Sequence, residues 1–269
     1  MATMNKTVMM INITSMNLLP VMERWLLQIH APETIGRIGP WLARYQSYRA
    51  TPPPPAMYAD VEQFGYYNWR VTELWSREGY SQHGILNQEF FPGYKQNIGL
   101  PTEVADAEVW HGRAAGPRQV VRCVVPARAT DDFKGSELAP SQYRSILRWL
   151  VAFKLPSGVS AEEGDRWYLD VHAPEVLKQP GLTRFVSHKV IPAVGRSWNW
   201  HRVSELWYDD FDAWRHATIV APPKYTQPAW ATHGTYPFFK PFVDFASTFL
   251  LESPTNTFWP NYGDYLVSV

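Results

Sequence analysis

The stretch MERWLLQIHAPETIG, which starts at Met22, returns 142 residues later as GDRWYLDVHAPEVLK from Gly164. Both copies contain Arg-Trp, a shared leucine and the whole tetrapeptide His-Ala-Pro-Glu, at residues 30–33 and 172–175. Two further matches follow in the same order, LARYQSYRA with LTRFVSHKV and YNWRVTELW with WNWHRVSELW. Three matched blocks in one order indicate an internal repeat.

We therefore predict a tandem duplication, with a first repeat at residues 1–135 and a second at residues 141–269. The stretch between the repeats, ATDDFKGSELAPSQ, is polar and contains Gly and Pro, as a linker does. A chain of 269 residues is long enough for two domains of ordinary size.

Each repeat shows the same order of predicted elements. Apolar runs rich in β-formers predict strands, and the segment with Arg-Trp and His predicts a helix between the first two. The predicted strands are 6–14, 45–49, 70–75 and 118–127 in the first repeat and 145–155, 185–191, 202–207 and 247–253 in the second. With a second helix, weakly signalled in both copies, this order is β-α-β-β-α-β, the ferredoxin-like plan. The predicted fold class is α+β, two ferredoxin-like units fused in one chain.

Two local signals bound the first helix of the second repeat. Ser160 precedes Glu162 and Glu163, which predicts an N-cap followed by an acidic first turn. Pro174 lacks an N–H, so the helix is predicted to end or restart there.

Composition excludes several classes of protein. With 45% hydrophobic residues the chain is predicted to fold, and 25 basic against 25 acidic residues argue against nucleic acid as a partner. The single cysteine, Cys123, excludes an intrachain disulfide. The first apolar stretch is too short for a secretory signal and no long apolar span follows, which predicts a cytoplasmic protein without a membrane partner.

The motifs resemble a known family. A strand, a helix that carries His-Ala-Pro, and a Pro-Gly-Leu-x-Arg-Phe turn at residues 180–185 resemble the EthD-like branch of the dimeric α+β barrel superfamily. The resemblance covers roughly the first 60 residues of each repeat, and the first repeat replaces the turn by Gly39-Pro40-Trp41-Leu42. It implies that the two units meet face to face and close a barrel within one chain, which is compatible with further association into a homodimer.

The resemblance also implies small cofactor-independent catalysts, namely decarboxylases, dehydratases, cyclases and lactone isomerases that act on aromatic or polyketide-like compounds. Other branches of the superfamily are metal-free monooxygenases, haem enzymes or proteins without known chemistry. A fold alone does not assign a reaction. With 13 Trp, 14 Tyr and 13 Phe, the chain has the rings to hold a flat substrate or to fill its core.

The histidines of the repeated tetrapeptide, His30 and His172, are the first catalytic candidates. Imidazole is suited to moving protons near neutral pH, and a helix end beside a sheet can face a cavity. The same histidines would serve equally well to order a helix stop. Tyr168 lies four residues before His172 and shares its predicted face.

The second repeat has further titratable groups. His188 stands where the first repeat has Tyr48, and His201 has no matching histidine in the first repeat. Both histidines are catalytic candidates, with solvated strand ends as the alternative. The predicted substrate-binding residues are Asn68, Trp69, Asn199, Trp200, Tyr48, Trp167 and Trp25.

Two repeated charged pairs remain open. Arg70 with Glu73 and Arg202 with Glu205 are each three apart, so the two members of a pair lie on opposite faces of a strand. One member of each pair is either an ion-paired group inside the barrel or, as we expect, part of a solvated face.

We predict neither a metal nor a cofactor. The sets His30 with Glu33 and His172 with Glu175 have suitable ligand types, but a proline inside each disturbs their alignment. No GxGxxG, P-loop, GxSxG or HExxH motif is present.

The sequence thus predicts a lyase or isomerase in aromatic compound metabolism. A histidine, His172 or His30, would move a proton next to a carbonyl or phenol of a small aromatic or hydrophobic substrate. The alternatives are a cofactor-independent monooxygenase and a protein that binds an aromatic ligand without transforming it.

Overall fold

The computed structural model is an α+β protein built from two copies of one topology. It describes residues 6–13, 15–77, 120–134, 147–191, 200–231, 246–251 and 256–259. The predicted domain boundaries at residues 135 and 141 lie outside these ranges and stay a prediction.

Four antiparallel strands form each repeat in the order expected for a ferredoxin-like unit. The first repeat contains β1 (Lys6–Ile13), β2 (Leu42–Arg49), β3 (Arg70–Ser76) and β4 (Val120–Lys134), arranged β4-β1-β3-β2. The second contains β5 (Leu147–Lys154), β6 (Arg184–Val190), β7 (Trp200–Tyr208) and β8 (Ala246–Leu251), arranged β8-β5-β7-β6. The predicted fold of two fused ferredoxin-like units is therefore confirmed.

The last strand of each repeat joins the two units. β4 pairs with β1 of its own repeat and then, from Ala127 onward, with β6 of the other repeat. In the same way β8 pairs with β5, and β9 (Asn256–Trp259), which four residues separate from β8, pairs with β2. The prediction ended β4 at residue 127, because its second half is specified by a partner in the other repeat and not by local pattern. These crossings make the fold an intramolecular version of the dimeric α+β barrel.

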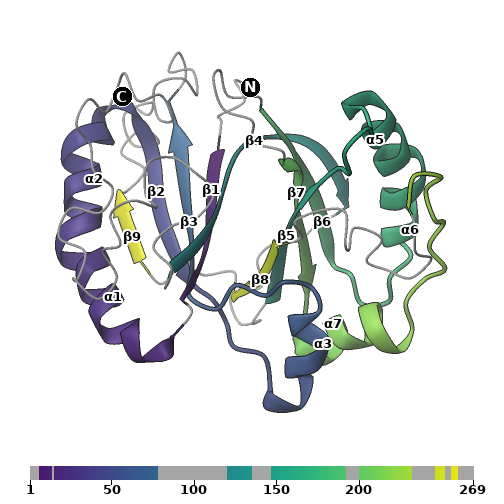
Figure 1. The fold of residues 1–269 in the computed structure, drawn as a ribbon, viewed down its shortest axis with the longest axis horizontal. Helices are drawn as coiled ribbons and strands as arrows, with labels where there is room; N and C mark the ends of the chain where they lie inside the picture. The colour runs from purple at the N-terminus through teal and green to yellow at the C-terminus, as the bar shows by residue number, and fades with distance from the viewer. Residues whose placement is uncertain are drawn as a thin grey trace, which may run out of the picture.

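Helices cover the two outer flanks of the barrel, as Figure 1 shows, with α1 and α2 on one side and α5 and α6 on the other. The first repeat contains η1 (Met16–Leu18), α1 (Leu19–Trp25), η2 (Leu26–His30), α2 (Ala31–Ile38) and η3 (Gly39–Trp41). The second contains α5 (Ala161–Trp167), η7 (Tyr168–His172) and α6 (Ala173–Val176). Ser160 caps α5 as predicted, because its side chain accepts a hydrogen bond from the Glu163 N–H.

The helix does not stop at the prolines. η2 and η7 are π-helical turns, and Pro32 and Pro174 stand in the first turns of the α-helical segments that follow them. A π turn accommodates the missing proline N–H without ending the helix. Of the two predicted outcomes at Pro174, the restart is the one found. The wider turn also brings the ring of His172 onto Trp167, five residues earlier, with 4.8 Å between ring centroids.

The first repeat also inserts a segment into the second. Between β2 and β3, η4 (Pro55–Met57) and α3 (Tyr58–Glu62) lie beside α7 (Phe211–Arg215) and η8 (His216–Val220) of the second repeat (Figure 1). Phe64 packs edge-on against Trp149 and Trp214 in the core of that repeat. The α7 and η8 segment fills the place of the weakly predicted second helix, whose counterpart in the first repeat lies outside the described residues.

Side chains of the strands alternate between the helical layers and the interior of the barrel. The interior holds an apolar cluster of Val8, Met10, Tyr48, Val71, Ala127, Leu150, Ala152, Val190, Val203, Ala246 and Leu250. The outer faces pack against the helices, with Ile11 and Trp69 under α1 and Phe153 and Phe185 under α5. In the part of the chain that the structure describes, no helix is both long and apolar enough to cross a membrane.

Candidate functional site

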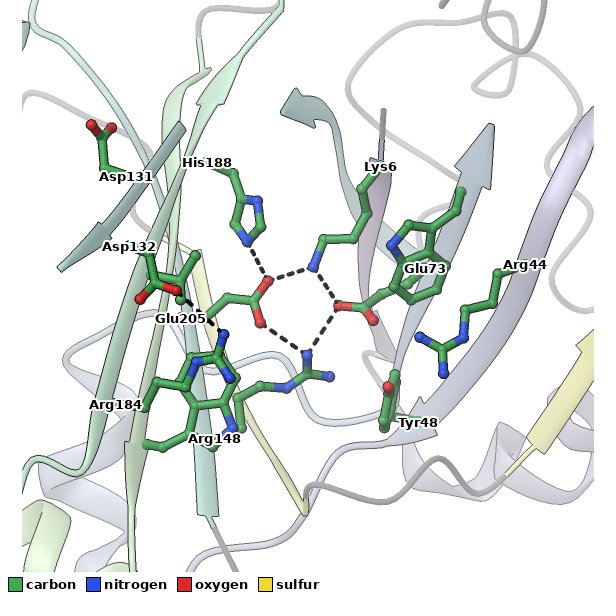
Figure 2. A pocket seen from close by; sticks show the side chains of 13 residues that line it. Lys6, Arg44, Tyr48, Glu73, Asp131, Asp132, Arg148, Arg184, His188 and Glu205 are labelled. Carbon is green, nitrogen blue, oxygen red and sulfur yellow. Dashed lines mark hydrogen bonds and ion pairs between the residues drawn. The ribbon is translucent and has the colours of Figure 1, made fainter. Parts of the chain in front are cut away.

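A polar cavity of about 410 Å³ lies between the two repeats, inside the barrel. Its lining contains five pairs of residues that occupy equivalent positions of the two repeats: Lys6 with Arg148, Glu73 with Glu205, Trp75 with Trp207, Tyr48 with His188, and Arg44 with Arg184. Asp131, Asp132 and Val186 complete the lining. Figure 2 shows that these side chains converge from strands of both repeats.

Four of these side chains form a closed ring of ion pairs (Figure 2). Lys6 Nζ contacts Glu73 Oε1 at 3.2 Å and also donates to Glu205. Arg148 Nη1 contacts Glu73 Oε1 at 3.3 Å and Glu205 Oε2 at 3.0 Å. The four side chains expose between 1% and 9% of their surface. Two cations and two anions thus balance inside the barrel, where an unpaired charge would be costly.

The ring fixes the charge of its members. Burial alone would lower the pKa of Lys6, but Glu205 and Glu73 outweigh it, so this pKa lies above its ordinary value. Burial would raise the pKa of Glu205, yet the neighbouring Lys6, His188 and Arg148 hold it well below the usual range. Lys6 is therefore a permanent ammonium ion, which excludes a neutral lysine nucleophile at this position, and Glu205 is a permanent carboxylate.

His188 adds an imidazole ring to the cavity, where its counterpart Tyr48 adds a phenol. Its Nε2 lies 2.5 Å from Glu205 Oε1, and because Glu205 is ionised, Nε2 carries the hydrogen of this bond. Nδ1 of His188 is buried and has no hydrogen-bond partner among the described residues. A carboxylate that holds one imidazole nitrogen while the other stays free is the arrangement of a general base.

Among the described residues no histidine contacts Glu73, the counterpart of Glu205. Tyr48 occupies the position of His188 and donates its hydroxyl hydrogen to Gln46 Oε1 at 3.2 Å. Oε2 of Glu73 is buried without a hydrogen-bond partner in the described part of the chain. Each repeat therefore contributes to the cavity lining a buried polar atom without a hydrogen-bond partner among the described residues, Glu73 Oε2 and His188 Nδ1.

The two arginines near solvent stack on the two tryptophans. Arg44 lies over the Trp75 ring at 4.9 Å and Arg184 over the Trp207 ring at 5.1 Å. Arg184 has 35% of its side chain exposed, more than any member of the inner ring, so this end of the cavity is its mouth.

His172 lies in the helical layer and does not line this cavity. It is 5% exposed and packs between Trp167, Tyr168 and Tyr225. Burial lowers its pKa to about 3, so it is neutral at pH 7. Tyr168 lies in the same layer, where its hydroxyl contacts Ser204 at 2.6 Å. The predicted neighbours His172 and Tyr168 thus do meet, but on the outer face of the sheet.

The outward arginines of the repeated pairs are buried beneath the helices. Arg70 makes two hydrogen bonds with Glu23 of α1, at 2.9 and 2.6 Å, and Arg202 donates to Asp165 of α5 at 2.9 Å. The expectation of a solvated face is wrong for both pairs, because Glu73 and Glu205 point into the barrel and the arginines bind helix acids.

Two more predicted residues contact the same helix acids. Trp69 Nε1 donates to Glu23 Oε1 at 2.8 Å, and at the equivalent position of β7 His201 Nε2 lies 3.1 Å from Asp165 Oδ1. The pKa of His201 is lowered to about 4, chiefly by burial. Neither residue lines the cavity.

The remaining predicted residues are dispersed. His30 stacks on Trp25 at 4.5 Å on the opposite flank from His172. Asn68 uses its side chain to bind both backbone groups of Ile13, each at 3.0 Å. Trp200 lies under Lys154 at 4.6 Å, and Asn199 lies outside the described residues.

Of the twelve predicted site residues, the cavity thus brings together His188 and Tyr48. It also uses residues that the prediction did not single out, above all Lys6, Arg148 and the two tryptophans. The sequence contained a sign of their importance, because each of these residues has a residue of similar chemistry at the equivalent position of the other repeat. Among the described residues no group of three or more His, Cys, Asp or Glu is arranged to hold a metal ion.

Comparison with known proteins gives partial matches. Residues 2–100 match the model of the chalcone isomerase N-terminal domain, which covers the first repeat up to and beyond β3. No curated protein matches the chain.

Solved structures that resemble the chain share little sequence with it. An anthrone oxidase-like protein is 10% identical, with 95% of this chain and 92% of that chain covered and a TM-score of 0.49. A mutant chlorite dismutase from Candidatus Nitrospira defluvii is 10% identical over 93% and 91% of the two chains, with a TM-score of 0.38. An EthD family protein from Bacillus halodurans is 20% identical over 28% of this chain and 72% of that chain, with a TM-score of 0.25.

Proposed function

We propose that the protein is a cofactor-independent lyase or isomerase that moves a proton within the barrel cavity. The observation that carries this proposal is the His188 and Glu205 pair, in which Nε2 is bound to an ionised carboxylate and Nδ1 has no hydrogen-bond partner among the described residues. The finer assignment to the EthD-like branch belongs to the same proposal.

In this mechanism Nδ1 of His188 takes a proton from a carbon next to a carbonyl group of the substrate. The Glu205 carboxylate keeps the ring in the required tautomer and stabilises the imidazolium that forms. The same nitrogen then returns the proton to another atom of the substrate, which gives an isomer, or the intermediate expels a leaving group, which gives a lyase product.

Lys6 is placed to stabilise the oxyanion of the intermediate. Its ammonium group has three hydrogens, and the described residues supply two acceptors, Glu73 and Glu205. The third hydrogen is available to a substrate oxygen. Because Lys6 is 7% exposed, its charge acts in a site with little water, where a preorganised cation stabilises developing negative charge most strongly.

The lining of the cavity favours an aromatic substrate. The rings of Trp75, Trp207 and Tyr48 line it. The match of residues 2–100 to a domain named for an isomerase supports the same class of reaction.

The test is exchange of substrate hydrogen with solvent. A panel of hydroxylated aromatic ketones is incubated with the protein in D₂O, and deuterium at the carbon next to the carbonyl is measured by NMR. A positioned base contributes about 10²–10⁴-fold, so His188→Gln is expected to slow exchange by that factor. His216→Gln is the matched control, because His216 is exposed on η8. Exchange by His188→Gln at the wild-type rate would contradict the proposal.

The same assay decides the predicted roles of His30 and His172. A loss in His172→Gln or His30→Gln as large as that expected for His188→Gln would move the reaction to the helical layer and overturn the cavity as its site. Oxygen uptake during turnover would identify a monooxygenase instead. Ligand recovered unchanged and without deuterium would identify a binding protein.

A further inference from the structure

We propose that the cavity binds an aromatic ligand that carries an acidic group, a carboxylate or an ionised phenol, and that Arg44 and Arg184 hold this group at the mouth. The inference deepens the proposed function by naming the class of substrate. It rests on that function only in using the same cavity, because binding does not require proton transfer.

The charges at the mouth of the cavity do not cancel. The lining contains four cations and four carboxylates, of which the inner ring balances two of each. Asp131 binds Arg202, which lies outside the lining, at 2.7 Å. Among the described lining residues, that leaves Asp132 to balance Arg44 and Arg184, so this part of the lining has one more positive than negative charge.

The contacts of the two arginines leave donors free. Arg184 Nη2 lies 3.7 Å from Asp132, whose side chain is 48% exposed, so this pair is weak. Nε of Arg184 is buried and has no hydrogen-bond partner among the described residues. For Arg44, the part of the chain that the structure describes supplies the Trp75 ring and no carboxylate. Both guanidinium groups therefore have N–H groups to offer an anion.

The stacking on tryptophan fixes how such an anion is received. A guanidinium group held over a ring is restricted in position, and its planar fork of N–H groups suits the two oxygens of a carboxylate. Arg44 over Trp75 and Arg184 over Trp207 come from equivalent positions of the two repeats. The same pair of residue types therefore lines the mouth from both sides.

The position of the arginines orients the ligand. The mouth lies at the more exposed end of the cavity, while Lys6 and His188 lie at its buried end. An acidic group held at the mouth directs the opposite end of a flat molecule toward the free Nδ1 of His188. Recognition and the reacting groups are then separated along one molecule.

A pair of probes that differ in charge tests the inference. 4-Hydroxycinnamate and its neutral amide are titrated into the full-length protein by calorimetry. The acid is expected to bind at least about tenfold more tightly than the amide, the value of one charge-assisted hydrogen bond. Equal affinities, or no binding of the acid at millimolar concentration, would overturn the inference.

Variants locate the contact. Arg44→Gln and Arg184→Gln are each expected to weaken binding of the acid by about tenfold and to leave the amide almost unaffected. Arg49→Gln is the matched control, because Arg49 is on the same strand as Arg44 but exposed and outside the cavity. Arg184→Lys keeps the charge and is expected to lose less than Arg184→Gln. An equal effect of Arg49→Gln and the two mouth variants would place binding elsewhere.

The two proposals fail in different ways. If the acid binds through the arginines but no deuterium enters any ligand, the proposed reaction is wrong and the ligand class stands. If exchange occurs with neutral ketones and is insensitive to Arg44→Gln and Arg184→Gln, the reaction stands and the ligand class is wrong.

Discussion

The two repeats supply the same glutamate to the cavity but surround it differently. Glu205 binds His188, whereas in the first repeat, which supplies Glu73 from the equivalent position of β3, the position of His188 is occupied by Tyr48, which donates to Gln46. Both glutamates hold Lys6 and Arg148. The ion ring is therefore the shared, structural part of the site, and the histidine is what makes one side of it suited to proton transfer.

The repeats also differ at a second position, but this difference does not point to proton transfer. His201 of the second repeat replaces Trp69 of the first, and each lies against the acid of its own helix, Asp165 or Glu23. Trp69 donates its indole N–H to Glu23, whereas His201 Nε2 lies 3.1 Å from Asp165 without a hydrogen-bond partner among the described residues. The comparison thus separates His201, which like its counterpart Trp69 lies against a helix acid, from His188, which binds a cavity glutamate while the tyrosine at its equivalent position donates to a glutamine.

Removing each glutamate in turn tests this comparison with the largest expected effect. Glu205→Gln and Glu73→Gln each leave buried cations short of a partner, which costs about 3–5 kcal/mol of unfolding free energy. Glu205→Gln is also expected to lower the rate of hydrogen exchange into substrate by about 10²-fold or more, because His188 loses the carboxylate that orients it. Denaturant unfolding and the exchange assay measure the two effects.

The control for both variants is Glu162→Gln, which changes an exposed glutamate of α5. A loss of exchange in Glu73→Gln equal to that in Glu205→Gln would show that the ring acts as a whole, and the distinction between the two repeats would fail.

The repeated His-Ala-Pro-Glu motif gives the next test. Burial lowers the pKa of His172 to about 3 from 6.5, so the native protein keeps this ring neutral while the unfolded chain binds a proton. Stability is then present above pH 6.5 and is lost as the pH falls toward 3. Between pH 6.5 and about 5 the loss is about 2 kcal/mol, and His172→Phe is expected to remove it.

Denaturant midpoints across this pH range provide the measurement. His30→Phe is the matched variant from the first repeat, at a more exposed position of the same motif. The same pH dependence in wild type and His172→Phe would contradict the role of burial at His172.

Most of the fold was predictable because the repeat and the strand patterns are local features of the sequence. Ser160 illustrates this, since a cap needs a residue only three positions away. The second half of β4 was not predictable in the same way, because its partner is β6 of the other repeat. The restart of the helix at Pro174 was one of two predicted outcomes, but the π turn that precedes it was not predicted, since a π turn has no simple sequence pattern.

The candidate site was predictable only in part. Lys6 and Glu205 are 199 residues apart and meet because two related units close one barrel. The feature of the sequence that could have predicted the cavity lining was the similarity of the two repeats. Residues that point inward and are alike in both repeats face one another across a shared cavity. Alternation along RVTELW and RVSELW placed Glu73 and Glu205 on one face, but the choice between interior and solvent required the partner strands.

The smallest expected effect concerns how the two repeats start their first helices. Ser160 Oγ accepts the Glu163 N–H at 3.1 Å, whereas Ser15, which precedes η1 in the first repeat, makes no such hydrogen bond. Ser160→Ala is therefore expected to lower the free energy of unfolding by about 1 kcal/mol. Ser15→Ala, its matched control, is expected to change it by less than about 0.5 kcal/mol. Equal losses in thermal or denaturant unfolding would mean that the side-chain cap contributes nothing specific to α5, and that both helices depend on packing alone.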